Sequence, residues 1–289
     1  MVARNIIPAR TPVATPDEGL VSDLLPPMLV LLAALSGGAI GILLLNRWEG
    51  NIWPYIVILL LIASIAVSDR LRRHGNLYLA WSTAASSTGN RTFTRSTNGG
   101  VTWMTPIEMP NRPVWGTLTV DADGTLYIGG VSSNRWPLFY LVRSSNARNS
   151  SQTPVFDLSQ PVNLNGTLVY GAGPNPGGLL GQVWIDVDRS GGPYHGRLYF
   201  LCSVNPPGTD PLDVYLAFST DRGATWSAPI RVNDDPPAAN AWQWFGTLAV
   251  APNGRVDVIW YDTRNDPNGL LSELRYTYSY DGGLTWAPS

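Results

Sequence analysis

Hydrophobic positions follow two different patterns along this 289-residue chain. Residues 28–45 and 52–67 are apolar runs without a charged side chain, each close to the shortest length that spans a bilayer as a helix. From residue 76 onward, short segments alternate hydrophobic and polar residues, which is the period of a β-strand. The pattern predicts a disordered tail at 1–27, a two-helix transmembrane hairpin at 28–67 and an all-β domain at 76–289.

The residues around the two apolar runs support the membrane interpretation. Trp48, Trp53 and Tyr55 flank a short polar turn between the runs, and such aromatic side chains settle at membrane interfaces. Three arginines at 70–73 follow the second run, and basic residues favour the cytoplasmic side of a membrane. We therefore predict a membrane protein with the lipid bilayer as a partner, and these arginines favour a cytoplasmic β-domain.

An eight-residue phrase, Ser-x-Asp-x-Gly-x-Thr-Trp, recurs in the β-domain. It is complete at 219–226 and 279–286, it has Asn in the third position at 96–103, and a worn copy begins at Ser144. The third side chain can accept hydrogen bonds from the amides of its own turn, glycine allows a strained backbone, and tryptophan anchors the hairpin. We interpret the phrase as a folding device, built by Ser96, Asn98, Gly100 and Trp103, by Ser219, Asp221, Gly223 and Trp226, and by Ser279, Asp281, Gly283 and Trp286.

The phrase resembles the Asp box, or BNR repeat, of sialidases and related β-propellers. Units of three predicted strands surround the copies at 115–144, 181–219 and 245–279, with a shorter unit at 76–96. This predicts an Asp-box β-propeller of about four blades, whereas the resemblance implies six. Three explanations of this difference are open: the chain is a fragment of a longer propeller, it closes by self-association through its open edges, or it forms a complete four-bladed propeller.

The amino-acid composition excludes several kinds of catalytic and binding site. The 29 glycines and 24 prolines favour many short elements, and all 19 basic residues are arginine, which excludes a lysine nucleophile or Schiff base. A net charge of -2 without an extended basic cluster gives no sign of nucleic-acid binding. One cysteine, Cys202, and two histidines exclude a disulfide framework and a Cys/His zinc site, and we expect Cys202 to be buried.

The candidate site lies at the end of the blades opposite the repeated turns. In a four-stranded blade the A–B and C–D turns share one end, so binding residues are expected on the B–C and D–A loops at the other. Resemblance to sialidases implies a tyrosine nucleophile, an aspartate and substrate-binding arginines, for which Tyr261, Asp262 and Arg264 are the candidates. The alternative is a structural strand end in which Asp262 and Arg264 bond the loop. The motif that supplies the family's first arginine is absent, so no arginine triad is assigned.

Further candidates for substrate binding lie on neighbouring loops. The tryptophans either stack on a sugar ring or fill the core, and we expect the core for one of Trp242 and Trp244. Asp234 and Asp235 have an alternative role to substrate binding: with Asp262 and Asp266 nearby they could hold a Ca²⁺ ion, because Ca²⁺ takes oxygen ligands. Otherwise no metal or cofactor is predicted. The substrate-binding candidates are Arg135, Trp136, Asp234, Asp235, Trp242 and Trp244.

Two functions remain open from the sequence. The first is a membrane-anchored, sialidase-like protein that recognises glycans, with exo-sialidase or another glycoside hydrolase activity. The second is a non-catalytic propeller that acts as an interaction scaffold. The incomplete catalytic set favours the absence of catalysis in this chain. Family resemblance favours an extracytoplasmic propeller, in contrast to the arginines, so the side of the membrane stays open.

Overall fold

The computed structural model describes residues 75–83, 87–237, 241–266 and 268–289. The predicted tail and the predicted membrane hairpin lie outside these residues. Within the described part of the chain there is no α-helix, and accordingly none that is long and apolar enough to cross a membrane. The prediction of an all-β domain is confirmed there.

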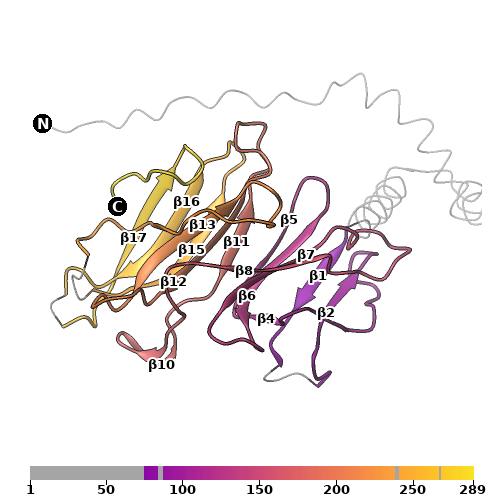
Figure 1. Cartoon of the computed structure of the whole chain (residues 1–289), viewed down its shortest axis with the longest axis horizontal. Helices are drawn as coiled ribbons and strands as arrows, with labels where there is room; N and C mark the ends of the chain where they lie inside the picture. Colours follow the sequence, from indigo (N-terminus) through magenta and orange to yellow (C-terminus); the bar gives the residue numbers. More distant parts are fainter. Residues whose placement is uncertain (1–74, 84–86, 238–240, 267) are drawn as a thin grey trace, which may run out of the picture. The chain divides into compact units, whose positions relative to one another are not determined.

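Four antiparallel sheets follow one another in chain order (Figure 1). In the second sheet, two short strands pair with different parts of the same neighbour, so together they form one interrupted inner strand. A small hairpin separates the second and third sheets. The strands of the first sheet are β1 (Leu77–Ala80), β2 (Arg91–Ser96) and β3 (Ile107–Glu108); those of the second are β4 (Pro113–Val114), β5 (Leu118–Val120), β6 (Leu126–Ser132), β7 (Phe139–Ser144) and β8 (Leu158–Val162); the hairpin is β9 (Tyr170–Ala172) and β10 (Asn175–Leu179); the third sheet is β11 (Trp184–Val187), β12 (Leu198–Val204), β13 (Asp213–Ser219) and β14 (Ile230–Arg231); and the fourth is β15 (Gln243–Val250), β16 (Val256–Asp262) and β17 (Glu273–Ser279).

The predicted three-strand units agree with the sheets that form. Each unit becomes an up-and-down run in which the repeated turn follows the third predicted strand. The outer strands β3, β8 and β14 come after those turns and have only two to five residues, so their sequences carry little periodic signal.

Apolar side chains fill the spaces between successive sheets. Phe93 and Leu126 belong to the cluster between the first and second sheets, Phe200 belongs to the next, and Trp260 belongs to the cluster between the third and fourth. Cys202 is fully buried in the middle cluster, as predicted. Face-to-face packing of this kind holds consecutive sheets together through side chains that alternate inward along each strand.

The repeated turns make the predicted local hydrogen bonds. In the clearest copy, the Ser219 hydroxyl accepts a hydrogen bond from the Gly223 amide at 2.8 Å, and the Asp221 carboxylate accepts one from the Thr225 amide at 2.9 Å. Gly223 has φ of +83°, a left-handed conformation that glycine adopts without a steric penalty. The copies at 96–103 and 279–286 repeat both bonds.

The worn copy after β7 forms the same turn with an insertion. The Ser144 hydroxyl donates to the Asn146 side-chain oxygen at 3.1 Å, and this oxygen accepts from the Val155 amide at 2.8 Å. Phe156 then occupies the anchoring position and packs edge-on against Phe93. The extra residues between Asn146 and Val155 hide this copy from a search at fixed spacing.

The first and fourth sheets each have one face that no other described strand covers. On β1, Leu77 and Leu79 point away from the second sheet and are 44% and 50% exposed. On β16, Ile259 is 39% exposed, whereas its neighbour Trp260 is fully buried against the third sheet. These outer faces do not cover each other, so the described strands form an open row of sheets.

We predict that Gly223→Ala destabilises the domain. An added Cβ would lie 2.3 Å from Leu141 Cδ2, at a position that already requires a left-handed backbone. Left-handed alanine costs roughly 1–2 kcal/mol and overpacking a similar amount, so the free energy of unfolding should fall by about 2 kcal/mol or more in urea titrations. Gly191→Ala is the control, because a Cβ there meets nothing within 4 Å. Equal stability of both variants would contradict this account of the turn.

Candidate functional site

A buried polar cluster joins the third and fourth sheets at the end opposite the repeated turns. Asp213 begins β13, Asp262 ends β16, and Asp235 lies in the loop between β14 and β15; all three are less than 5% exposed. The Gln243 amide links two of them, since Nε2 lies 3.2 Å from Asp235 Oδ2 and 3.3 Å from Asp262 Oδ1. The Asn233 amide links the other pair, at 2.7 Å from both Asp213 Oδ1 and Asp235 Oδ1.

Two arginines form ion pairs with the carboxylates of this cluster. Arg231 donates from Nε to Asp213 Oδ1 at 2.7 Å and pairs with Asp235 at 3.1 Å. Arg264 donates from Nε to Asp262 Oδ2 at 2.9 Å and from Nη1 to Asp234 Oδ1 at 2.6 Å. Burial raises the pKa of Asp262, but the Arg264 ion pair and the 2.8 Å hydrogen bond from Trp260 Nε1 outweigh it and hold that pKa below its usual range.

Tyr261 points to the opposite side of β16 from Asp262. Successive side chains of a strand alternate between its two faces, so Asp262 enters the buried cluster while Tyr261 reaches the outer face of the fourth sheet. Tyr261 is 43% exposed and Asp262 only 1%. The three catalytic candidates are therefore divided: Asp262 and Arg264 bond each other, and Tyr261 lies apart. Their catalytic roles stay predictions.

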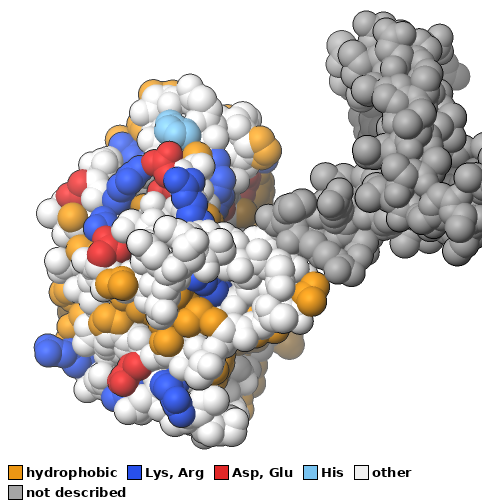
Figure 2. All heavy atoms as spheres, turned by 90° about the vertical axis from the view of Figure 1, so that its right-hand side faces the viewer, with side chains coloured by type: hydrophobic (Ala, Val, Ile, Leu, Met, Phe, Trp, Pro, Cys, Tyr) orange, Lys and Arg blue, Asp and Glu red, His pale blue; other side chains and the backbone are white. Residues whose placement is uncertain are grey.

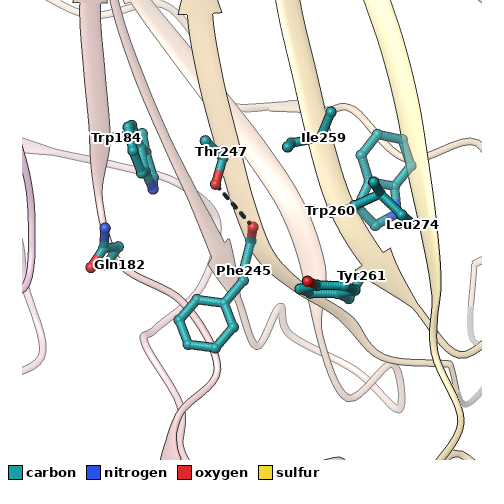
Figure 3. Close-up of a pocket in the computed structure, with 8 residues that line it drawn as sticks. All are labelled: Gln182, Trp184, Phe245, Thr247, Ile259, Trp260, Tyr261 and Leu274. Carbon is teal, nitrogen blue, oxygen red and sulfur yellow. Dashed lines mark hydrogen bonds between the residues drawn. The ribbon is translucent and has the colours of Figure 1, made fainter.

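Tyr261 lines a hollow of about 310 Å³. Figure 3 shows Trp184 and Gln182 on one side of it, Phe245 and Thr247 in the middle, and Tyr261 on the other side. The Trp244 ring lies 5.0 Å from the Tyr261 ring and 5.3 Å from that of Phe245, and its Nε1 donates to Ser272 Oγ at 2.9 Å. The remaining lining residues are Ile259, Trp260 and Leu274.

A β-bulge places Phe245 in this hollow. Trp244 pairs with Tyr261 and Thr247 pairs with Ile259, so two residues of β15 face one residue of β16. Phe245 has φ of +52°, a left-handed conformation that is rare for a bulky side chain. Bulges re-aim side chains, and residues in such backbone conformations concentrate at functional sites.

The other binding candidates occupy different surroundings. Arg135 and Trp136 are exposed on the loop between β6 and β7, away from the buried cluster. Asp234 bonds Arg264 and the Ser289 amide, while Asp235 is buried with Arg231. These two aspartates are thus parts of one ion-pair network and do not form an open acidic pair.

The prediction that one of Trp242 and Trp244 belongs to the core was wrong. Both are half-buried, and the residue between them, Gln243, is the one that is fully buried. Residues i and i+2 of a strand share a face, so both tryptophans lie on the side opposite Gln243. Trp242 packs against the small hairpin, where a Cβ on Gly173 would lie 2.5 Å from its ring.

No metal site emerges from the described residues: none of their Asp, Glu, His and Cys side chains form a group of three placed to hold an ion. Asp266, expected near a Ca²⁺ site, instead accepts hydrogen bonds from the amides of Leu270 and Leu271. Arginine and amide partners already occupy Asp234, Asp235 and Asp262.

Sequence reasoning missed Gln182, Trp184 and Phe245. Trp184 begins β11 and Gln182 lies two residues before it, whereas Phe245 lies in β15. The sequence predicts only strand units at 181–219 and 245–279, with no binding residue at these three positions. One signal was present: Trp115-Gly116-Thr117-Leu118 and Phe245-Gly246-Thr247-Leu248 repeat an aromatic-Gly-Thr-Leu sequence at the start of two inner strands.

Comparisons with known proteins give structural similarity at low sequence identity. No protein-family model and no curated protein matches the chain. An intramolecular trans-sialidase from Ruminococcus gnavus in complex with oseltamivir carboxylate is 17% identical over 72% of this chain and 41% of its own, with a TM-score of 0.41. A Penicillium chrysogenum α-L-arabinanase complexed with arabinobiose is 15% identical over 65% of this chain and 54% of its own, with a TM-score of 0.41. The α-L-arabinofuranosidase Arb93A from Fusarium graminearum is 18% identical over 59% of this chain, with a TM-score of 0.40. The chain spans 45% of the length of this last protein.

We predict that Asp262→Asn destabilises the protein far more than Asp123→Asn. An Asn amide group would place an N–H donor against one of the buried donors that Asp262 accepts from, Arg264, Trp260 or Gln243, and a buried hydrogen bond to a charged group contributes about 1.5–3 kcal/mol. Arg264 keeps Asp234 as an ion-pair partner in this variant. The Asp123–Arg222 pair has both side chains more than half exposed, and an exposed pair contributes about 0–1 kcal/mol. Urea unfolding at neutral pH measures both variants. Similar losses would show that the buried cluster does not stabilise the loop end.

We also predict that the cluster makes stability depend on acid pH. The folded-state pKa of Asp262 lies below its unfolded value of about 3.9, so its contribution is complete above pH 4 and is lost as the pH falls through the folded value. As the pH is lowered below 4, the urea concentration at the unfolding midpoint should therefore decrease for the wild type, and more steeply than for Asp262→Asn. Parallel curves for the two proteins would exclude Asp262 as a source of the dependence.

Proposed function

We propose that this domain binds a carbohydrate in the hollow beside Tyr261, and that its described residues bind the sugar without cleaving it. The observation that carries the proposal is the division of β16 into two faces: aromatic and uncharged polar groups surround the hollow, while the acidic Asp262 is bonded on the buried side. Resemblance of the repeated turns to Asp boxes agrees with a glycan-recognising propeller.

The lining of the hollow suits a sugar ring. Aromatic rings of Tyr261, Phe245 and Trp184 provide flat apolar surfaces, on which the C–H faces of a sugar can pack. The Tyr261 hydroxyl and the Gln182 amide can exchange hydrogen bonds with sugar hydroxyls. Concave sites with largely apolar walls and a few placed polar groups are typical of small-ligand binding.

Binding is favoured over hydrolysis by the positions of the acidic groups. Glycoside hydrolases use two carboxylates beside the scissile bond, or a tyrosine nucleophile with acidic partners. No carboxylate is found among the described residues that line the hollow. Asp262 lies on the far side of β16 with Arg264, and Glu273 is bonded to Arg275 and Asn265. This supports the non-catalytic alternative, while a tether to the membrane rests on residues 28–67 alone.

We predict that Tyr261→Ala weakens glycan binding by the full-length protein. A glycan microarray selects the ligand, and isothermal titration with that glycan should show at least a tenfold weaker Kd for Tyr261→Ala, because the stacking ring is lost. Tyr261→Phe should retain most of the affinity, since the ring remains. Tyr280→Ala is the control, because Tyr280 is 63% exposed beside a repeated turn at the other end.

Three results would separate the alternatives. Absence of any array signal from the wild type rejects carbohydrate binding. Hydrolysis of a fluorogenic sialoside or arabinoside, lost in Tyr261→Phe with the fold intact, makes Tyr261 a catalytic residue and rejects the non-catalytic proposal. Equal affinities of wild type and Tyr261→Ala place the sugar elsewhere.

The uncovered outer sheets favour a second candidate, self-association of this chain. Leu77 and Leu79 on the first sheet and Ile259 and Tyr276 on the fourth expose apolar surface at opposite ends of the row. The two end faces differ, so their contact would be head-to-tail between copies.

We predict that Leu79→Glu and Tyr276→Glu each reduce the mass of the full chain in detergent toward that of the monomer. Either charge would be buried without a partner in a head-to-tail contact, which is unfavourable. Analytical ultracentrifugation measures the mass. A wild type that stays monomeric at all concentrations rejects this candidate and leaves the carbohydrate proposal intact.

A further inference from the structure

We infer that the domain has a second aromatic subsite, formed by Trp115 and Trp136, and that its ligand is an oligosaccharide or polysaccharide long enough to contact both subsites. The inference rests on the proposed function of the first hollow. It follows from a backbone feature that occurs twice, from a second hollow at that feature, and from the hydrogen bonds that connect the two.

The inner strand of the second sheet carries the same kind of bulge as β15. Val114 pairs with Val131 and Leu118 pairs with Ile128, so three residues, 115–117, face two on β6. One residue is in excess, as at Phe245. The aromatic residue at the bulge is again left-handed, with φ of +50° for Trp115 and +52° for Phe245.

Glycine after the aromatic residue makes this conformation possible in the second sheet. A Cβ on Gly116 would lie 2.0 Å from the Gly129 carbonyl oxygen, so the inner strand approaches β6 more closely than any other residue allows. This close approach leaves Trp115 outside the ladder, and its indole is 37% exposed. A left-handed tryptophan that is also exposed is costly, and such costs are typical of functional positions.

Trp136 completes the second subsite. Its indole is 50% exposed and stands edge-on to that of Trp115, with ring centroids 5.2 Å apart. Trp115 comes from the bulge of the inner strand and Trp136 from the loop between β6 and β7, at the same end of the second sheet. Trp115, but not Trp136, also borders a hollow of about 170 Å³ between this inner strand and residues 80–82 of the first sheet. Figure 2 looks at the domain from the side of the first sheet and shows hydrophobic side chains gathered on the side that faces the viewer.

Backbone hydrogen bonds place the two subsites on either side of one segment. The Val183 amide donates to the Trp115 carbonyl at 2.9 Å, and the Phe245 amide donates to the Leu180 carbonyl at 2.8 Å. Residues 180–183 thus lie between the two bulges. Hydrogen-bonded neighbouring chains lie about 4.8 Å apart, so backbones on either side of one segment are about 10 Å apart. The two subsites are therefore too far apart for one sugar ring.

The chemistry of both subsites fits an extended and largely neutral sugar chain. Each offers aromatic faces, and Gln182 in the middle offers an amide that can donate and accept. A terminal monosaccharide would use one subsite only. A chain of several sugars gains from both, because the second contact is intramolecular once the first has formed.

The test compares long and short forms of one ligand with the full chain. Three neutral polymers, arabinan, xylan and galactan, are screened by affinity gel electrophoresis, and the disaccharide of the polymer that binds best is titrated alongside it. We expect Trp136→Ala to weaken polymer binding at least tenfold and to change disaccharide binding less than twofold, whereas Tyr261→Ala weakens both. Trp115→Asn, which tolerates the left-handed backbone, should act like Trp136→Ala.

Tyr280→Ala is again the control, since Tyr280 is an aromatic residue that is 63% exposed at the opposite end and should not affect binding. Unchanged polymer affinity in folded Trp136→Ala, with binding lost in Tyr261→Ala, overturns the second subsite and leaves the proposed function standing. A wild type that binds none of these polymers and no glycan on the array overturns both. Circular dichroism and the urea midpoint establish that each variant is folded.

Discussion

The buried ion-pair cluster at the loop end of the third and fourth sheets is the interaction on which the proposed site depends. Three carboxylates with less than 5% exposure are held by two arginines and two side-chain amides. An unpaired charge at this depth is strongly unfavourable, so the cluster fixes the direction of Asp262. Alternation along β16 then fixes Tyr261 on the outer face. The position of the candidate binding residue is thus a consequence of the bonding of its acidic neighbour.

The two ends of the sheets use polar groups in different ways. At the repeated turns, the serine hydroxyl and the aspartate or asparagine oxygen are consumed by amides of the same turn. Burial raises the pKa of Asp281, but hydrogen bonds from the Thr285 hydroxyl and amide and from Ser279 bring it down to about 2. Little capacity for a ligand remains there. The other end carries longer loops, two bulges and several half-exposed aromatic rings, which is why the proposed binding site is placed there.

Local patterns in the sequence predicted most of the fold, and non-local contacts decided the site. The repeated turns and the three-strand units depend on residues within a few positions of one another, so their spacing identified them. Partners of Asp262, such as Gln243, are distant in the chain and follow only from sheet packing. The bulges were not predicted for another reason. A single extra residue reverses the face on which all later side chains of the strand lie, and periodicity alone does not locate that residue. The error at Trp242 and Trp244 came from assigning opposite faces to residues two apart.

The equivalence of the inner strands links these findings. Leu118, Ile185 and Leu248 are equivalent, because they pair with equivalent residues of the next strand: Ile128, Phe200 and Val258. Three residues before each of them stand Trp115, Gln182 and Phe245, which therefore occupy one position in three successive sheets. The bulged strands carry an aromatic residue at this position, and the strand between them carries an amide. Core packing alone would favour buried aliphatic residues there. Two aromatic residues with left-handed backbone and an amide residue between them instead resemble the alternation of stacking and hydrogen bonding that a sugar chain requires.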